Sequence, residues 1–254
     1  EPLYVLATAD EESTMSGARA LTDSGKKLGR YALIGEPTGL RPVHMHKGIL
    51  VESIKLLGRA AHASNPSLGN SAIEGMYAVI NALTAWRGEL QRAYNNECFH
   101  VPVPTLNFGS IHGGDSPNRI CAECVMNIEL RLLPGMALTE FRSGLHDVVR
   151  RAVAGSGLAV EMQANFDGVP AMHTDLDAEI VQYAEKLSGH GAGAVNFVTE
   201  GPCLNAMGMQ TVVLGPGDID QAHQANEYLA LDRIRPMLGI ISGMIGHFCI
   251  GEKT

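Results

Sequence analysis

The stretch Leu3-Tyr4-Val5-Leu6-Ala7-Thr8-Ala9-Asp10-Glu11-Glu12 decides the class of fold that the sequence predicts. Its apolar first part, Leu3–Thr8, predicts a buried strand that ends at three acidic residues. A helix with a serine cap is expected over Ser13–Ala20, followed by a second apolar strand over Tyr31–Gly35. This alternation of strand, acidic loop and helix is typical of an α/β sheet that carries its chemistry at the strand ends.

A compact insert is expected inside this sheet domain, over residues 46–168. The apolar spacing there predicts elements in the order β-α-β-β-α-β, which is that of a ferredoxin-like domain. They are Gly48–Leu57, Ser71–Arg92, Pro104–Ile111, Ala122–Leu132, Thr139–Ala154 and Leu158–Ala164. Residues 1–45 and 169–254 would then form the sheet domain. Its elements after the insert are a helix, a strand and a helix over Asp175–Ser188, Gln210–Leu214 and Leu229–Phe248.

The composition is that of a globular protein with an excess of acidic residues. Of 254 residues, 45% are apolar and 18% charged, and the formal net charge is −8. That balance argues against nucleic acid as a partner, because neutralising phosphates needs a basic face. No apolar run reaches the roughly 18 residues of a membrane span, and the first residues lack the basic start of a signal peptide. An odd number of cysteines is typical of reduced thiols in a cytoplasmic protein, and Cys121-x-x-Cys124 has no second pair with which to form a zinc knuckle.

Potential metal ligands follow three of the predicted strands. The acidic residues 10–12 end the first strand, Glu36 follows the second, and His223 lies in a polar loop after the strand at Gln210–Leu214. Taken alone, residues 10–12 favour a solvated turn near a helix N-terminus, where the helix dipole stabilises acidic side chains. Taken together, carboxylate and imidazole groups are a ligand set that suits zinc or cobalt.

Several stretches resemble, in the same order, motifs of the di-zinc aminoacylase and carboxypeptidase family, which includes acetylornithine deacetylases, succinyl-diaminopimelate desuccinylases and glutamate carboxypeptidases. They are Thr8-Ala9-Asp10-Glu11-Glu12, Gly35-Glu36-Pro37-Thr38, Gly58-Arg59-Ala60-Ala61-His62-Ala63-Ser64 and Ala222-His223-Gln224-Ala225-Asn226-Glu227. The resemblance covers essentially the whole chain. It is closest to the acetylornithine deacetylase branch in His46-Lys47-Gly48, Asn107–Arg119 and Val198-Thr199-Glu200-Gly201-Pro202. It implies an α/β fold: a mixed-sheet, zinc-peptidase-like catalytic domain, incomplete in this chain, interrupted by a ferredoxin-like lid.

The resemblance also implies roles for the strand-end residues. Glu11 resembles the general base that deprotonates a metal-bridging water. Glu12 and His223 resemble ligands of one metal and Glu36 a ligand of the other, in a site for two Zn²⁺ ions or Co²⁺. The implied reaction hydrolyses the amide bond of N2-acetyl-L-ornithine to L-ornithine and acetate, a step of arginine biosynthesis. The chemistry is reasonable because zinc lowers the pKa of a bound water to about 7 and a nearby carboxylate can move its proton.

The lid contributes three further candidates. His62 resembles a lid histidine that reaches the active site of the dimer mate and stabilises the developing oxyanion, which implies a homodimer through the lid. Asn118 and Arg131 resemble residues that bind the carboxylate of a small N-acyl amino acid. Without the resemblance, a strand-end histidine bonded to backbone is the better explanation of His62. Arg131 is equally well explained as a solvated strand residue. Glu200, outside the lid, is a candidate partner for a substrate amine, with a surface acid as the alternative.

The family pattern has two more metal ligands ahead of the acidic pair, a histidine in a His-x-Asp motif and a bridging aspartate. The ten residues that precede Glu11 contain neither motif. The sequence therefore predicts a fragment that, alone, binds at most one zinc weakly and has no appreciable activity. Two alternative functions stay open: a related N-acyl amino acid hydrolase such as a succinyl-diaminopimelate desuccinylase, and an inactive dimerisation module.

Overall fold

The structure, a computed structural model, describes residues 2–251. The chain forms two compact units. Unit 1 contains the described residues of Glu1–Lys47, Cys98–His100 and Ala171–Thr254, and unit 2 contains Gly48–Glu97 and Val101–Pro170. The expected insert ran without interruption from residue 46 to 168, whereas the segment Cys98–His100 groups with unit 1.

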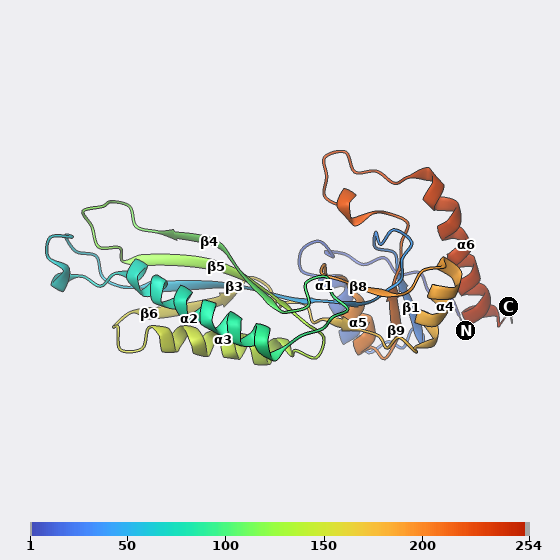
Figure 1. Ribbon diagram of the computed structural model, residues 1–254, viewed down its shortest axis with the longest axis horizontal. Coiled ribbons are helices and arrows are strands. Elements are labelled where there is room, and N and C mark those ends of the chain that lie inside the picture. The colour runs from blue at the N-terminus through green and yellow to red at the C-terminus, as the bar shows by residue number, and fades with distance from the viewer. Residues whose placement is uncertain (1, 252–254) are drawn as a thin grey trace. The chain divides into compact units, whose positions relative to one another are not determined.

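Unit 2 has the predicted β-α-β-β-α-β order. Its antiparallel sheet has the strand order β4-β5-β3-β6, and helices α2 and α3 lie side by side over one face (Figure 1). The element bounds are β3 (Gly48–Leu57), α2 (Ala72–Ala93), β4 (Thr105–Gly113), β5 (Glu123–Leu132), α3 (Leu138–Ala152) and β6 (Ala159–Ala164), with a 3-10 turn at Pro66–Leu68. The prediction of a ferredoxin-like arrangement is confirmed.

Strict alternation of side chains explains why these strands form one sheet. In β3, Leu50, Ile54 and Leu56 are fully buried. In β5, every second residue from Cys124 to Leu132 is buried against the helices, while the residues between them are partly exposed. Residues of a strand that are two apart share a face, so this pattern fixes which face of the sheet α2 and α3 cover. Burial of an aliphatic side chain stabilises the fold by about 1.5–3 kcal/mol.

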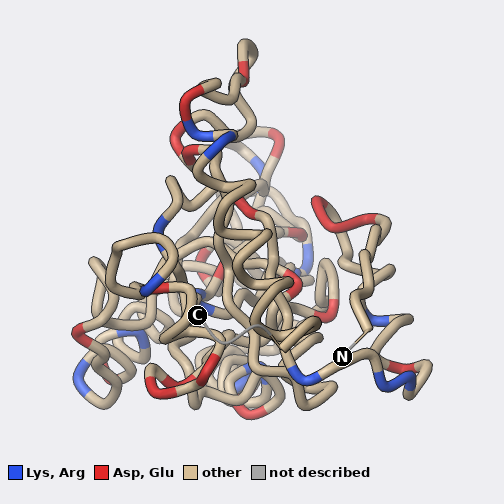
Figure 2. Tube along the Cα trace, turned by 90° about the vertical axis from the view of Figure 1, so that its right-hand side faces the viewer, with Lys and Arg blue, Asp and Glu red and all other residues tan. Residues whose placement is uncertain are grey.

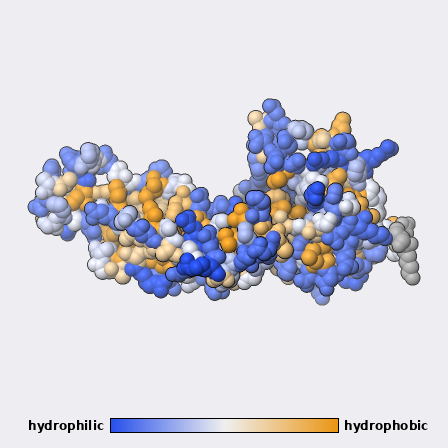
Figure 3. All heavy atoms as spheres, in the orientation of Figure 1, coloured by the Kyte–Doolittle hydropathy of each residue, from blue (hydrophilic) through white to orange (hydrophobic). Residues whose placement is uncertain are grey.

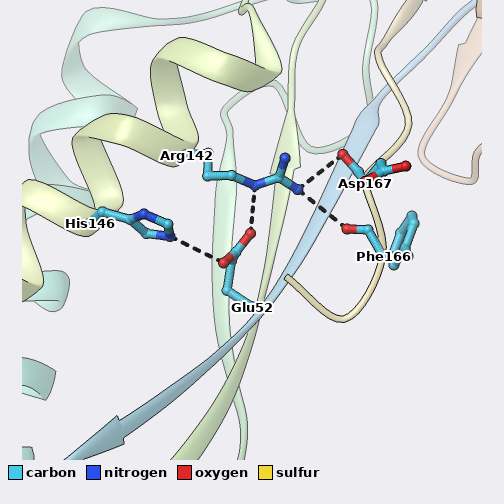
Figure 4. Close-up of polar contacts among 5 residues, drawn as sticks. All are labelled: Glu52, Arg142, His146, Phe166 and Asp167. Atoms are coloured by element: carbon cyan, nitrogen blue, oxygen red, sulfur yellow. Dashed lines mark hydrogen bonds and ion pairs between the residues drawn. The ribbon is translucent and has the colours of Figure 1, made fainter. Parts of the chain in front are cut away.

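A buried ionic network joins the strand and helix layers of unit 2 (Figure 4). The Glu52 side chain of β3 is completely buried, and it accepts a 2.7 Å hydrogen bond from Arg142 Nε of α3. His146, one helical turn further on, brings its Nε2 to 3.2 Å from the other carboxylate oxygen. Arg142 also donates to the backbone carbonyls of Phe166 and Asp167. The buried charge of Glu52 is therefore matched by a cation and by hydrogen bonds, as burial of a carboxylate requires.

Unit 1 contains a mixed five-stranded sheet, which confirms the predicted fold class. The path is β1-β9-β2-β7, with β8 paired to β2; β1 and β9 are parallel, whereas β2 is antiparallel to β9 and β7. The strands are β1 (Tyr31–Ile34), β2 (Val43–His46), β7 (Met172–His173), β8 (Gly193–Val195) and β9 (Gln210–Val213). The helices are α1 (Ser16–Asp23), α4 (Glu179–Ser188), α5 (Gly201–Ala206) and α6 (Ile234–Ile245). Buried side chains of α4 and α6 form a core with those of β9.

The prediction of a buried strand at Leu3–Thr8 is wrong. This segment has no strand assignment, and Leu3 and Val5 are 57% and 89% exposed. A strand needs a neighbour for its backbone donors and acceptors, and in the part of the chain that is described none pairs with this segment. The predicted serine cap of the first helix is also wrong, because α1 has Met15 at its N-cap, with a φ of 54°.

Two helices beyond the insert differ from their predicted bounds. Helix α4 begins at Glu179 instead of Asp175, because a turn closed by Ala178 N–H and the Asp175 carbonyl precedes it. The predicted helix over Leu229–Phe248 is divided into a 3-10 turn at Leu231–Arg233, α6, and a π-helix at Gly246–Ile250. No helix within residues 2–251 is long and apolar enough to cross a membrane.

Buried His44 of β2 makes the stability of unit 1 depend on pH. Its Nδ1 lies 2.7 Å from the carbonyl oxygen of Thr174 and donates to it. Desolvation lowers the pKa of His44, and the nearby His173 lowers it further, while the Thr174 bond and the charges of Glu185 and Asp175 oppose the shift. A depressed histidine pKa favours the neutral form in the folded state. Its contribution to stability is thus fully present above the unfolded pKa of about 6.5 and is lost as the pH falls through the folded pKa.

We expect His44→Asn to reduce the loss of stability between pH 7.5 and pH 5.5, because the amide keeps a donor for Thr174 but cannot titrate. Urea unfolding of the wild type and the variant at both pH values measures the effect. His190→Asn, at an exposed position, is the control and should keep the wild-type pH dependence. An equal loss in the wild type and in His44→Asn would contradict the prediction.

Candidate functional site

The loops that follow β1 and β9 carry two of the predicted metal ligands, Glu36 and His223. Because β1 and β9 are parallel neighbours, their carboxyl ends lie at the same edge of the sheet. The two loops are also bonded to each other: Gly215 N–H donates to Thr38 Oγ1 at 3.1 Å and Gly39 N–H donates to the Gly217 carbonyl at 2.7 Å. The sheet and these bonds therefore hold Glu36 near the start of the His223 loop.

A tight turn presents Glu11 and Glu12 ahead of α1. Asp10 has a φ of 61°, and its carbonyl accepts the N–H groups of Ser13, Thr14 and Met15. The Asp10 carboxylate also accepts a hydrogen bond from Ser16 Oγ. Asp10 therefore folds the turn on which Glu11 and Glu12 lie.

Glu200 ties the acidic turn to a distant part of unit 1. Its Oε1 accepts a 2.5 Å hydrogen bond from Thr8 Oγ1, across 192 positions of sequence. The preceding residue, Thr199, is fully buried and donates its N–H to Nε2 of His46 at 3.2 Å. Gly201 N–H in turn donates to Thr199 Oγ1. Buried hydrogen bonds thus set the position of Glu200 beside the segment that carries Glu11.

The carboxylates of this cluster repel one another. Burial raises the pKa of Glu11 to about 7, and the charges of Glu36, Glu12 and Glu200 add to the rise, while that of His223 opposes it. Burial also raises the pKa of Glu36, with further contributions from Glu12 and Glu200. Negative charge is therefore in excess at this point, and it favours a bound cation.

The donor set fits a divalent metal in chemistry, but it is not a closed ligand shell. Glu12 and His223 approach to 3.6 Å, with side chains that are 77% and 74% exposed. His223 has a φ of 61°, and its backbone N–H donates to Glu227. Within residues 2–251, no three side chains of His, Cys, Asp or Glu lie close enough to hold one metal ion. In the predicted ligand set, Glu12 and His223 would hold one metal and Glu36 the other.

In unit 2, His62 and Asn118 lie on two loops that are paired with each other. His62 forms an isolated bridge with Arg119, and Ala63 N–H donates to the Asn118 carbonyl at 2.9 Å. Both side chains of interest are exposed, and Asn118 Oδ1 accepts a bond from Ser116. The predicted catalytic residue His62 and the predicted substrate-binding residue Asn118 therefore lie on neighbouring, paired loops.

Arg131 lies at the other end of the same sheet. It pairs with Ile49 at the start of β3, whereas Glu123, which begins β5, pairs with Leu57 at the end of β3 near the His62 loop. At about 3.3 Å per residue, the eight steps from Arg131 to Glu123 span roughly 26 Å. Arg131 Nε donates to Glu129 at 2.7 Å. One copy of unit 2 therefore cannot offer all three predicted residues to the same small molecule.

Sequence patterns assigned no role to Thr8, His46 or Ser64. In the structure, these residues form hydrogen bonds with Glu200, Thr199 and His62, respectively. Ser64 could have been found, since a serine two residues after a histidine can bond its ring nitrogen. Thr8 and His46 carry no such signal, because their partners are 192 and 153 positions away.

The chain is similar to several known proteins. Residues 44–155 match the family described as a peptidase dimerisation domain. An acetylornithine deacetylase of Edwardsiella ictaluri is 42% identical over 98% of the chain and 65% of its own length. Those of Proteus mirabilis and Vibrio cholerae are 40% and 41% identical, over 65% and 66% of their own lengths. The chain thus spans about 65% of the length of the curated relatives it matches.

Solved structures show the same fold at low sequence identity. Aminopeptidase PepT from Bacillus cereus superposes with a TM-score of 0.74 at 18% identity, covering 94% of the chain and 62% of that protein. An M20 family metallo-carboxypeptidase from Sulfolobus solfataricus gives a TM-score of 0.65 at 16% identity, covering 92% of the chain and 67% of that protein.

Proposed function

The chain belongs to the M20 family, with acetylornithine deacetylases among its relatives, and from this membership we propose that it serves the metal-dependent hydrolysis of N2-acetyl-L-ornithine to L-ornithine and acetate. The observation that carries the proposal is the gathering of Glu11, Glu12, Glu36 and His223 at one edge of the unit 1 sheet, with the pKa of Glu11 raised to about 7. A base is most effective when its pKa is near the working pH.

Each of the proposed site residues has a separate role in the hydrolysis. Two divalent metal ions, Zn²⁺ or Co²⁺, would supply Lewis-acid chemistry at the amide carbonyl and the attacking water. Glu12 and His223 would hold one of them and Glu36 the other. Glu11 takes the proton of the attacking water and later delivers it to the leaving amine. His62 donates a hydrogen bond to the developing oxyanion, and the charge that forms there makes this bond stronger in the transition state than in the substrate.

A substrate panel tests the function. In a longer polypeptide that joins this chain to the two further metal ligands of the family pattern, and with Zn²⁺ or Co²⁺ supplied, N2-acetyl-L-ornithine should be hydrolysed in preference to N-succinyl-L,L-diaminopimelate. A preference for the succinyl substrate would contradict the proposal and favour desuccinylation.

The dimerisation-domain match also supports a second candidate, a non-catalytic module. Sedimentation beside calorimetric zinc titration distinguishes the two, since a dimer that binds no zinc supports the module.

We further propose a cytoplasmic homodimer that associates through unit 2, and the separation of Arg131 from the His62 loop supports it. If one substrate needs His62, Asn118 and Arg131, the separation of the two ends of the sheet requires that these residues come from two copies of the chain. The odd number of cysteines fits a reducing compartment. Lys and Arg are interspersed with Asp and Glu along the trace (Figure 2), which gives no support to a nucleic-acid partner.

The edge of the unit 2 sheet at β4 is the surface where association is expected. β4 ends the sheet among the described strands, so one side of its backbone is unpaired. Apolar atoms are exposed over β4 and β5 (Figure 3), and Ile111 of β4 and Tyr77 of α2 are 51% and 69% exposed.

We expect Ile111→Lys combined with Tyr77→Asp to convert a dimer to a monomer in sedimentation velocity. Leu176→Lys, a control on unit 1, should stay dimeric; a double variant that stays dimeric would place the interface elsewhere.

Glu200 is proposed to bind the side-chain amine of the substrate. We expect Glu200→Gln to raise the KM for N2-acetyl-L-ornithine while sparing neutral N-acetyl amino acids, because only the cationic substrate loses a charge partner. Thr8→Val, which removes the hydrogen bond to Glu200 and keeps its charge, is the matched control. Equal losses on the two substrate types would show that Glu200 only supports the acidic turn.

A further inference from the structure

Ser64 is in contact with His62 through two of its groups. The backbone N–H of Ser64 donates to His62 Nδ1 at 3.2 Å, and Ser64 Oγ lies 2.7 Å from the same nitrogen. A backbone N–H can only donate, so Nδ1 must present its lone pair. In the neutral imidazole, the single ring proton is then on Nε2.

The backbone around His62 is held from both sides. Asn65 N–H donates to the His62 carbonyl at 3.0 Å, which closes a turn. Ala63 N–H donates to the Asn118 carbonyl, and Ile120 N–H donates to the Ala61 carbonyl at 2.8 Å. With the backbone fixed, the contact with Ser64 is what decides how the exposed ring is turned and which nitrogen faces outward.

We propose that Ser64 is a positioning residue that holds His62 as the Nε2–H tautomer, ready to donate a hydrogen bond to the oxygen of the scissile acyl group. The inference rests on the proposed function of His62. In the opposite tautomer, Nε2 would present a lone pair to an oxygen that gains negative charge, and the interaction would be repulsive. Preorganised donors of this kind contribute to catalysis because they need no reorientation during the reaction.

Three substitutions in the full chain separate this role from a structural one. Ser64→Ala removes the hydroxyl, and Ser64→Thr restores one. Ser67→Ala is the matched control, because Ser67 is an exposed serine of the same loop whose hydroxyl bonds to Asn65 Oδ1 at 2.7 Å. The readout is the pair of ring ¹⁵N chemical shifts of His62 in two-dimensional NMR, assigned by their loss in His62→Gln. At about pH 8.5 an ordinary imidazole is neutral, so the shifts report the tautomer.

The wild type, Ser64→Thr and Ser67→Ala should show well-separated His62 nitrogen shifts, with the proton on Nε2. In Ser64→Ala, the backbone N–H of residue 64 still donates to Nδ1 but the hydrogen bond of the hydroxyl is lost, so the two shifts should move part of the way toward each other as the second tautomer is populated. Unchanged shifts in Ser64→Ala, or a wild-type proton on Nδ1, would overturn the inference. The catalytic role of His62 is tested separately by the turnover of His62→Gln. If that variant turns over like the wild type while Ser64→Ala mixes the tautomers, the proposed role of His62 fails and the positioning by Ser64 stands.

Discussion

Glu11→Gln is expected to lower kcat for N2-acetyl-L-ornithine by about 10²–10⁴-fold, the contribution typical of a general base. Glutamine keeps the size and hydrogen bonding of the side chain but cannot accept a proton. The structure places the carboxylate of Glu11 within electrostatic reach of Glu36, Glu12 and Glu200 and raises its pKa to about 7. The measurement is steady-state turnover of the longer polypeptide that joins this chain to the two further metal ligands of the family pattern, with Zn²⁺ or Co²⁺ supplied, beside calorimetric titration of the same metal.

Glu12→Gln is the comparison variant that distinguishes a metal ligand from a general base. Glu12 lies 3.6 Å from His223 and is proposed as a metal ligand, so its amide should weaken zinc binding by more than about tenfold. Glu11→Gln should leave zinc binding unchanged. The prediction fails if the two variants show the same loss of metal affinity, because Glu11 would then be a ligand instead of the base.

Arg142→Met is expected to destabilise the protein by about 3–5 kcal/mol, the usual cost of leaving a buried charge without its partner. The Glu52 side chain has no exposed surface, and Arg142 supplies its 2.7 Å hydrogen bond and its cation (Figure 4). Arg142 also holds the Phe166 and Asp167 carbonyls, so the chain leaving β6 loses two bonds at the same time. Urea unfolding followed by circular dichroism measures the loss.

The double variant Glu52→Met with Arg142→Met tests the cause. Replacing both charges with apolar groups of similar length removes the unpaired carboxylate, so the double variant should be more stable than Arg142→Met alone. Arg150→Met serves as the control on α3, because the pair of Arg150 with Asp147 is exposed on both sides and such pairs contribute little. A double variant less stable than Arg142→Met would mean that packing, and not charge, explains the loss.

The insert was predictable in detail because its signals are long and regular. The strand Gly48–Leu57 was predicted with the bounds it has in the structure, and α2 and α3 were predicted to within two residues at each end. The sheet of unit 1 was harder to predict from the sequence. Its strands β7 and β8 have two and three residues, and such short strands do not show a period of two. Leu3–Thr8 has the composition of a strand, but composition does not supply a pairing partner.

The sequence by itself determined which residue types carry the proposed chemistry, because Glu11, Glu12, Glu36, His223 and His62 occur in recognisable motifs. Only the tertiary structure decided what surrounds them. The bond between Thr8 and Glu200 joins residues 192 positions apart, and the pKa of Glu11 rises through burial and through carboxylates on other loops. Likewise, the distance between Arg131 and the His62 loop follows from strand register. Local patterns record propensity and spacing along the chain, whereas burial, charge repulsion and register arise between segments that only folding brings together.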